Sequence, residues 1–166
     1  MYRLIVGHLL RRAFRHLSAG DYEHVVVKFT PDATFCFAGD HAQGGELRGP
    51  AEIRRWFQRL FRLFPGLAFA PQAIVVSGWP WDTIAATQFR VRATLPDGAI
   101  YRNEGMQLLR LRWGRVVEER LYEDTQLLAT TLASLARQGV TEALAVPLGP
   151  VRAAFAPPAT DTEKPR

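Results

Sequence analysis

The sequence predicts an α+β fold in which helices come first and a long antiparallel sheet follows. Two helices are expected before the first strand, because the segment Ser18–Phe37 (SAGDYEHVVVKFTPDATFCF) contains a helix end, a helix start and a turn into a β run. Pro65-Gly66 ends a later helix, and strand patterns with short turns then follow one another. This segregation of helices and strands is typical of α+β proteins rather than of doubly wound sheets.

An amphipathic helix is predicted over residues 2–17, because its apolar side chains recur at the helical spacing. Gly20 suits the left-handed end of a helix. Asp21 can accept hydrogen bonds from the free N–H groups of the next turn, so a second, short helix is expected over 22–29.

The first strand is predicted over 33–38, which is rich in Phe and Thr. The glycine-rich segment 39–49 is expected to be a loop or hairpin, and its tip a flexible loop rather than a lid. Pro50 favours the start of a helix over 51–64. Four strands and a helix complete the order ααβαββββα, over 68–77, 83–95, 100–112, 115–122 and 125–138, with Asp124 as the helix cap.

Composition is that of one globular domain. The chain has 166 residues, of which 48% are hydrophobic and 22% charged. No apolar run approaches the roughly 20 residues of a membrane span, so no membrane partner is expected. The single cysteine, Cys36, excludes an internal disulfide and favours a cytoplasmic location. The net charge of +5 comes from scattered arginines without a basic block, which argues against nucleic-acid binding.

Four segments carry a resemblance to a known family: AGDYEHVVVKFTPDATF (19–35), LRGPAEIRRWF (47–57), PDGAIYRNEG (96–105) and RLRWGRVVEERLYEDTQLL (110–128). In this order they resemble the nuclear transport factor 2-like (NTF2-like) superfamily, and within it the SnoaL-like, polyketide cyclase-like proteins. The resemblance implies a cone of helices packed in a curved sheet, over residues 1–138. Residues 139–166 are then a C-terminal extension, predicted to be disordered from about 147.

The superfamily includes isomerases, epoxide hydrolases, dehydratases, cyclases and non-catalytic domains, so the fold leaves the function open. At positions where ketosteroid isomerases resembled here carry a tyrosine, a base aspartate and a protonated aspartate, this chain has Ala13, Phe37 and Gln107. The final-strand aspartate of the hydrolases and cyclases falls on Leu121. The hydrolases' strand pair falls near Gln88 and Arg90. The known acids of these enzymes are therefore missing.

Strand alternation predicts which polar side chains face the interior instead. On the third long strand, Asn103 and Gln107 are expected to point inward, where amides could stabilise an oxyanion or could form a self-satisfied polar network. On the last strand, the same register turns Glu119 and Glu123 inward. Glu119 is the candidate acid or base, with a solvated surface pair as the alternative, and Glu123 is interpreted as a surface residue.

The remaining candidates would contact a ligand. Aromatic side chains at the pocket wall or rim can stack on a flat ring. His16 lies one turn beyond Ala13 and could pair with an inward glutamate, although a solvated histidine is the preferred interpretation. No spacing of His, Asp and Glu suggests a metal site. The predicted ligand contacts are Tyr101, Phe37, Trp56, Trp79, Trp81, Leu121 and His16.

Together these observations predict a SnoaL-like pocket protein for a small hydrophobic ligand. The leading hypothesis is a cofactor-independent cyclase, isomerase, dehydratase or hydrolase that acts on an oxygenated ring compound, with catalytic residues Glu119, Gln107 and Asn103. The alternative is a non-catalytic ligand-binding or dimerisation module. The resemblance also implies a homodimer through the outer sheet face, which would present Gln88, Arg90, Arg92, Arg102 and Arg110.

Overall fold

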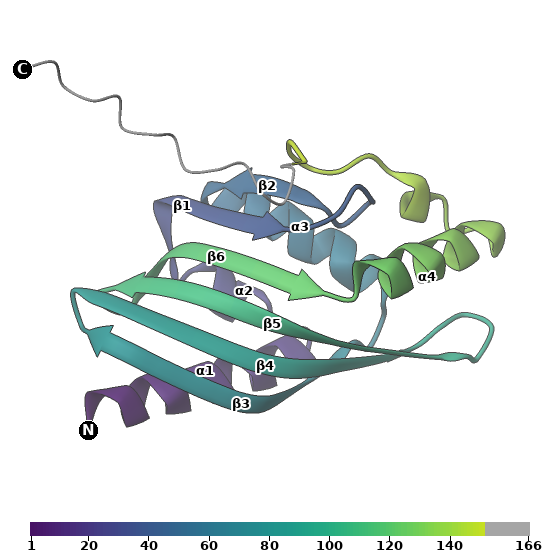
Figure 1. The fold of residues 1–166 in the computed structure, drawn as a ribbon. Coiled ribbons are helices and arrows are strands. Elements are labelled where there is room, and N and C mark those ends of the chain that lie inside the picture. Colours follow the sequence, from purple (N-terminus) through teal and green to yellow (C-terminus); the bar gives the residue numbers. More distant parts are fainter. Residues whose placement is uncertain (152–166) are drawn as a thin grey trace, which may run out of the picture.

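The computed structural model describes residues 1–151 and shows a curved six-stranded sheet with helices on its concave side (Figure 1). The helices are α1 (Tyr2–Ser18), α2 (Glu23–Val26), α3 (Gly49–Leu63), α4 (Thr125–Arg137) and the 3₁₀ turn η1 (Thr141–Leu144). The strands are β1 (Phe29–Phe37), β2 (Gly45–Arg48), β3 (Ala68–Trp79), β4 (Asp82–Thr94), β5 (Ile100–Arg112) and β6 (Arg115–Glu123).

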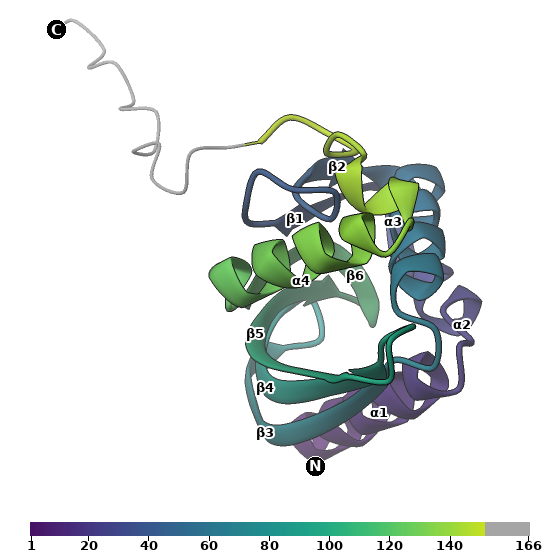
Figure 2. The same ribbon diagram turned by 90° about the vertical axis from the view of Figure 1, so that its right-hand side faces the viewer.

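The strand order is β2-β1-β6-β5-β4-β3, so the last strand lies at the centre of the sheet beside the first. β1 runs parallel to β6, and every other neighbouring pair is antiparallel. Figure 2 looks along the cone: the sheet curls round, α1 lies against β3, and α3 and α4 close the other side. The α+β prediction and the NTF2-like cone are confirmed.

The expected element bounds hold for the four long strands and α4 to within two residues, but they fail around β1. The second helix ends at Val26, and β1 already begins at Phe29. Phe29 pairs with Val116 of β6, and the Val116 N–H donates to the carbonyl of Lys28 at 2.9 Å. Strand pairing with a distant segment therefore ends the helix earlier than the local signal predicts.

The glycine-rich segment also differs from expectation. It forms the short strand β2 at one end, and its tip folds inward: Ala42 is 2% exposed and Gln43 1%. Trp56 Nε1 donates to the carbonyl of Gln43 at 2.7 Å, and Arg59 Nη1 donates to the carbonyl of Ala42 at 2.6 Å. The prediction of a flexible tip was wrong, because two side chains of α3 satisfy its backbone carbonyls inside the fold.

The described part of the C-terminal extension lies against the domain. Arg62 forms two-pronged hydrogen bonds to Glu142, and Arg59 Nη1 donates to the carbonyl of Val146 at 2.9 Å. The N–H of Glu46 donates to the carbonyl of Pro150 at 3.0 Å. The boundary at residue 138 stays a prediction. Disorder was predicted from about residue 147: residues 147–151 are placed against the domain instead, and 152–166 lie outside the described residues.

Candidate functional site

The interior of the cone contains two hollows that share one wall. The inner cavity, of about 40 Å³, lies among aromatic side chains of α3 and the sheet and has room for one or two waters. The outer pocket, of about 450 Å³, opens between α1, α2 and the β5–β6 hairpin and is large enough for a small organic ligand. Both hollows are bounded by Glu119.

Glu119 faces the interior because side chains alternate along β6, with Leu121 buried on the same side of the sheet; a register shift between Val116 and Glu118 turns Val116 to that side as well. It is 4% exposed, and Gln107 Nε2 of the neighbouring strand donates to its Oε1 at 2.5 Å. Burial raises the pKa of Glu119 to about 7, and the hydrogen bond from Gln107 opposes that rise. A carboxyl group of this kind changes its protonation state near neutral pH, as a general acid or base must.

A second carboxyl group, that of Glu123, is half-buried further along the same strand, at the α4 end of the cone. It lines the inner cavity, so its interpretation as a surface residue was wrong, and desolvation raises its pKa to about 7. Asn103 Nδ2 lies 2.9 Å from Tyr101 Oη, 3.3 Å from Glu123 Oε2 and 3.1 Å from the carbonyl of Asp124. Burial also raises the pKa of Tyr101. Asp124 caps α4 as expected, accepting from the N–H of Leu127 at 2.9 Å.

Gln43 is a candidate that the sequence reading missed. Its side chain lines the inner cavity at 1% exposure, and neither amide atom has a hydrogen-bond partner among the described residues. A buried amide without partners is costly, so a polar group entering the cavity would relieve that cost. The sequence signal that could have indicated a tightly folded loop here is the glycines beside Gln43. A Cβ on Gly44 would meet the carbonyl oxygen of Gly39 at 1.8 Å.

Two more interior polar atoms have no partner among the described residues, namely Gln107 Oε1 and Thr87 Oγ1. Thr87 of β4 is opposite Gln107 of β5 in the register, and Gln107 reaches Glu119 of β6. A row of polar side chains thus crosses three strands on the concave face. It leads to the carboxyl group that bounds both hollows.

The predicted ligand contacts divide into three groups. Tyr101, Phe37, Trp56 and Leu121 line the inner cavity, and their contact with a ligand stays a prediction. Trp79 and Trp81 line neither hollow: they lie at the β3–β4 hairpin with 62% and 55% of their surfaces exposed, so the expectation of a pocket rim there was wrong. A two-residue turn at the far end of the sheet carries them outward.

His16 also lies outside the lining of both hollows. Its Nδ1 is 2.8 Å from Asp21 Oδ2, its Nε2 accepts from Arg12 Nε at 3.4 Å, and its ring stacks on that of His24 at 3.7 Å. His16, Asp21 and His24 could each offer a metal-ligand atom within 4.8 Å of the others. Both nitrogens of His16 already have partners, so the cluster is a closed network at the α1–α2 corner, and the absence of a metal site stays a prediction.

The architecture is that of an NTF2-like protein. The sequence profile of the SnoaL-like domain matches residues 10–119, and the chain belongs to that family. None of the curated proteins matches the sequence. None of the helices in residues 1–151 is long and apolar enough to cross a membrane.

Solved structures share the fold at low sequence identity. PrhC from Penicillium brasilianum NBRC 6234 is 18% identical with a TM-score of 0.73, over 87% of this chain and 96% of that one. IdmH from Streptomyces antibioticus, described as a candidate polyketide cyclase, is 21% identical with a TM-score of 0.63, over 76% and 97%. AclR from Streptomyces galilaeus, described as a candidate hydroxylase, is 18% identical with a TM-score of 0.61, over 79% and 95%. These similarities establish the fold and leave the chemistry to the site.

Proposed function

We propose that this protein binds a small hydrophobic, oxygenated compound in the outer pocket and moves a proton with Glu119. The observation that carries the proposal is the position of Glu119, a buried carboxyl group on the wall of an open, ligand-sized pocket. A structural glutamate would more usually be paired with a cation, whereas this one has an amide. The proposed reaction class is an acid–base isomerisation, cyclisation, dehydration or hydrolysis without a cofactor.

Each interior polar group has a separate role in this proposal. Gln107 donates an N–H to Glu119 and so orients the carboxyl group. That N–H is then not free to stabilise an oxyanion. Gln43 offers a donor and an acceptor in the inner cavity, on the wall of which Glu119 also lies, and that cavity has room for water but not for the ligand. Asn103, tied to Tyr101 and Glu123, holds the α4 end of the cone together.

A non-catalytic binding module is the second candidate. The position of the related isomerases' base is filled by Phe37, and that of their acid by Gln107, which favours binding without turnover. In that case Glu119 would serve only to hydrogen-bond the ligand.

A general-base probe separates the two candidates. 5-Nitrobenzisoxazole is a flat, apolar compound whose C3 proton is removed by a carboxylate as its N–O bond breaks, giving a coloured cyanophenolate. We expect the wild-type protein to catalyse this opening with a rate that rises through an apparent pKa near 7. Glu119→Gln should lower the rate at least about 100-fold, the usual scale of general-base catalysis.

The matched control is Glu123→Gln, which removes the other carboxyl group with a raised pKa and should leave the rate unchanged.

A second measurement is the binding of N-phenyl-1-naphthylamine, a neutral fluorophore for apolar pockets. Fluorophore binding without any opening of the benzisoxazole would favour the binding module. Equal rates in the wild type and in Glu119→Gln would remove Glu119 from the proposal.

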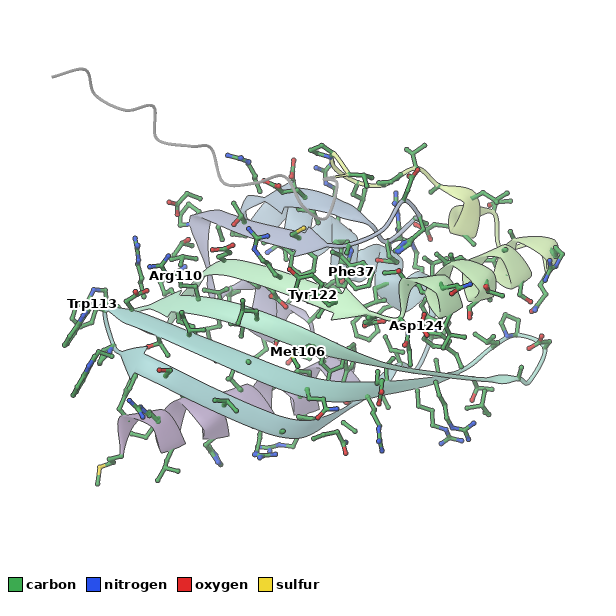
Figure 3. The ribbon with its side chains drawn as sticks, viewed as in Figure 1. Phe37, Met106, Arg110, Trp113, Tyr122 and Asp124 are labelled. Atoms are coloured by element: carbon green, nitrogen blue, oxygen red, sulfur yellow. The ribbon has the colours of Figure 1, made fainter. Side chains whose placement is uncertain are left out.

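We also propose a homodimer through the outer sheet face. Figure 3 shows Met106 and Tyr122 on that face, away from the helices. Exposed apolar side chains gather at its centre: Val75, Ile84, Met106, Leu108 and Tyr122. Ion pairs such as Arg90–Glu104 and Arg110–Asp82 flank them, so both charge signs are present for a self-complementary contact. Sedimentation that shows only monomer at micromolar concentration would overturn the dimer.

A further inference from the structure

One end of the molecule carries three exposed tryptophans. Trp79, Trp81 and Trp113 are 62%, 55% and 73% exposed, although they come from two different hairpins. The Trp79 and Trp81 rings are stacked with centroids 5.7 Å apart, and Trp113 lies 6.3 Å from Trp81. The Trp113 N–H donates to the carbonyl of Pro80 at 2.6 Å, which fastens one hairpin to the other. The exposed indoles are therefore held together as one surface.

The start of α1 extends this surface. Tyr2 Oη lies 2.6 Å from Thr83 Oγ1, and that hydroxyl donates to the carbonyl of Trp79 at 2.7 Å. Leu4 and Ile5 follow with 79% and 52% exposure. Figures 1 and 3 show the N-terminal turn of α1 and the labelled Trp113 at the same end of the cone. We call this surface the tryptophan end, comprising Trp79, Trp81, Trp113, Leu4 and Ile5.

The charge around the tryptophan end is positive. Arg3 precedes Leu4, and Arg112 and Arg115 flank the Trp113-Gly114 turn, all three with exposed side chains. The nearby Asp82 is paired with Arg110 at 2.7 Å. Indole rings partition to the headgroup level of a bilayer, and arginines bind lipid phosphates there. Apolar side chains ringed by arginine match an anionic membrane surface better than they match an acidic protein surface, which would leave the indoles without apolar partners.

The outer pocket extends to this same end. Its wall includes Tyr2 and Ile5 of α1 and Gly114 of the β5–β6 turn, which neighbours Trp113. A hydrophobic compound dissolved in a bilayer would meet the pocket without crossing water if the tryptophan end were seated on that bilayer.

We propose that the tryptophan end docks on an anionic lipid surface and that the outer pocket takes up its ligand there. This revises the sequence-based expectation that the protein has no membrane partner, because a surface contact needs no spanning helix. The docking proposal rests only on the residues of the tryptophan end and the charges around it. Ligand uptake also rests on the proposed function of the pocket.

Vesicle sedimentation with the full chain tests the docking. Large vesicles of phosphatidylcholine and phosphatidylglycerol at 7:3 should bind the protein, with a blue shift of tryptophan fluorescence, and vesicles of phosphatidylcholine alone should bind it at least tenfold more weakly. The double variant Trp81→Ala/Trp113→Ala should lose at least tenfold in affinity. Leu144→Ala, which removes an exposed apolar side chain outside both the tryptophan end and the outer sheet face, is the control and should bind as the wild type does.

Three results would overturn the proposal. The first is a failure of the wild type to bind the anionic vesicles, and the second is unchanged binding by the double variant. The third is self-association of the wild type that the double variant abolishes, because the occupant of the surface would then be a second copy. None of these measurements involves Glu119, so the proposed function can fail or hold independently.

Discussion

Two inward-facing carboxyl groups of β6, the buried Glu119 and the half-buried Glu123, have pKa values shifted in the same direction but lie in different surroundings. Glu119 bounds the open pocket and has one amide partner, Gln107. Glu123 lies four residues on, where Asn103 connects it to Tyr101 and α4 begins two residues later. Burial raises the pKa of each to about 7. A raised pKa therefore does not mark the reactive group by itself; access from a ligand-sized pocket does.

The largest expected effect is a change in the pH dependence of folding stability when both carboxyl groups are replaced. The pKa of each carboxyl group rises from 4.5 to about 7 on folding, so the unfolded chain ionises first as the pH rises. The stability that each of these two groups contributes is then fully present below pH 4.5 and is lost between pH 4.5 and 7, by about 3 kcal/mol for each group. In urea unfolding at pH 5 and pH 8, Glu119→Gln/Glu123→Gln should lose most of the wild type's pH dependence.

Each single variant should lose about half of that dependence. A double variant with the same loss of stability from pH 5 to pH 8 as the wild type would show that neither carboxyl group is desolvated. A loss confined to one single variant would show that only that group is buried in solution.

A smaller effect tests which carboxyl group a ligand can reach. Ala13 lines the outer pocket, so Ala13→Trp should fill part of it and weaken N-phenyl-1-naphthylamine binding at least tenfold, or about 1.4 kcal/mol. Ala129→Trp places the same side chain on the exposed face of α4 and serves as the control. Fluorescence titration measures both. Unchanged affinity in Ala13→Trp would place the ligand elsewhere.

The smallest effect concerns the inner cavity. Gln43→Leu replaces a buried amide without partners by an apolar side chain of similar size, and should stabilise the ligand-free fold by about 1 kcal/mol. Thermal unfolding gives that number. Gln138→Leu, which removes an exposed amide bonded to Asp97, should not stabilise the fold and is the comparison. Destabilisation by Gln43→Leu would mean that the amide is satisfied in solution, for instance by bound water.

The inward positions of Gln107 and Glu119 were predictable from the sequence, because they depend on the local geometry of each strand. Alternation along β5 and β6 places Gln107 and Glu119 on one face whatever the rest of the chain does. The inward direction of Glu123 followed from the same rule, but its burial did not, since that depends on α4 folding back over the strand end.

The sequence did not indicate Gln43, and it misplaced Trp79 and Trp81, for a different reason. The position of Gln43 depends on hydrogen bonds from α3 to a glycine-rich loop. The two tryptophans depend on a tight hairpin that turns them outward. Contacts between distant segments decide both outcomes, and spacing along the chain does not encode them.

A carboxyl NMR titration tests most directly whether Glu119 is the ligand-accessible acid or base. Side-chain ¹³C signals of the two glutamates, assigned with Glu119→Gln and Glu123→Gln, should both titrate near pH 7. Saturation with N-phenyl-1-naphthylamine should move the pKa of Glu119 and leave that of Glu123 in place. A Glu119 signal that titrates near 4.5, or a probe that shifts only Glu123, would contradict the assignment of the site.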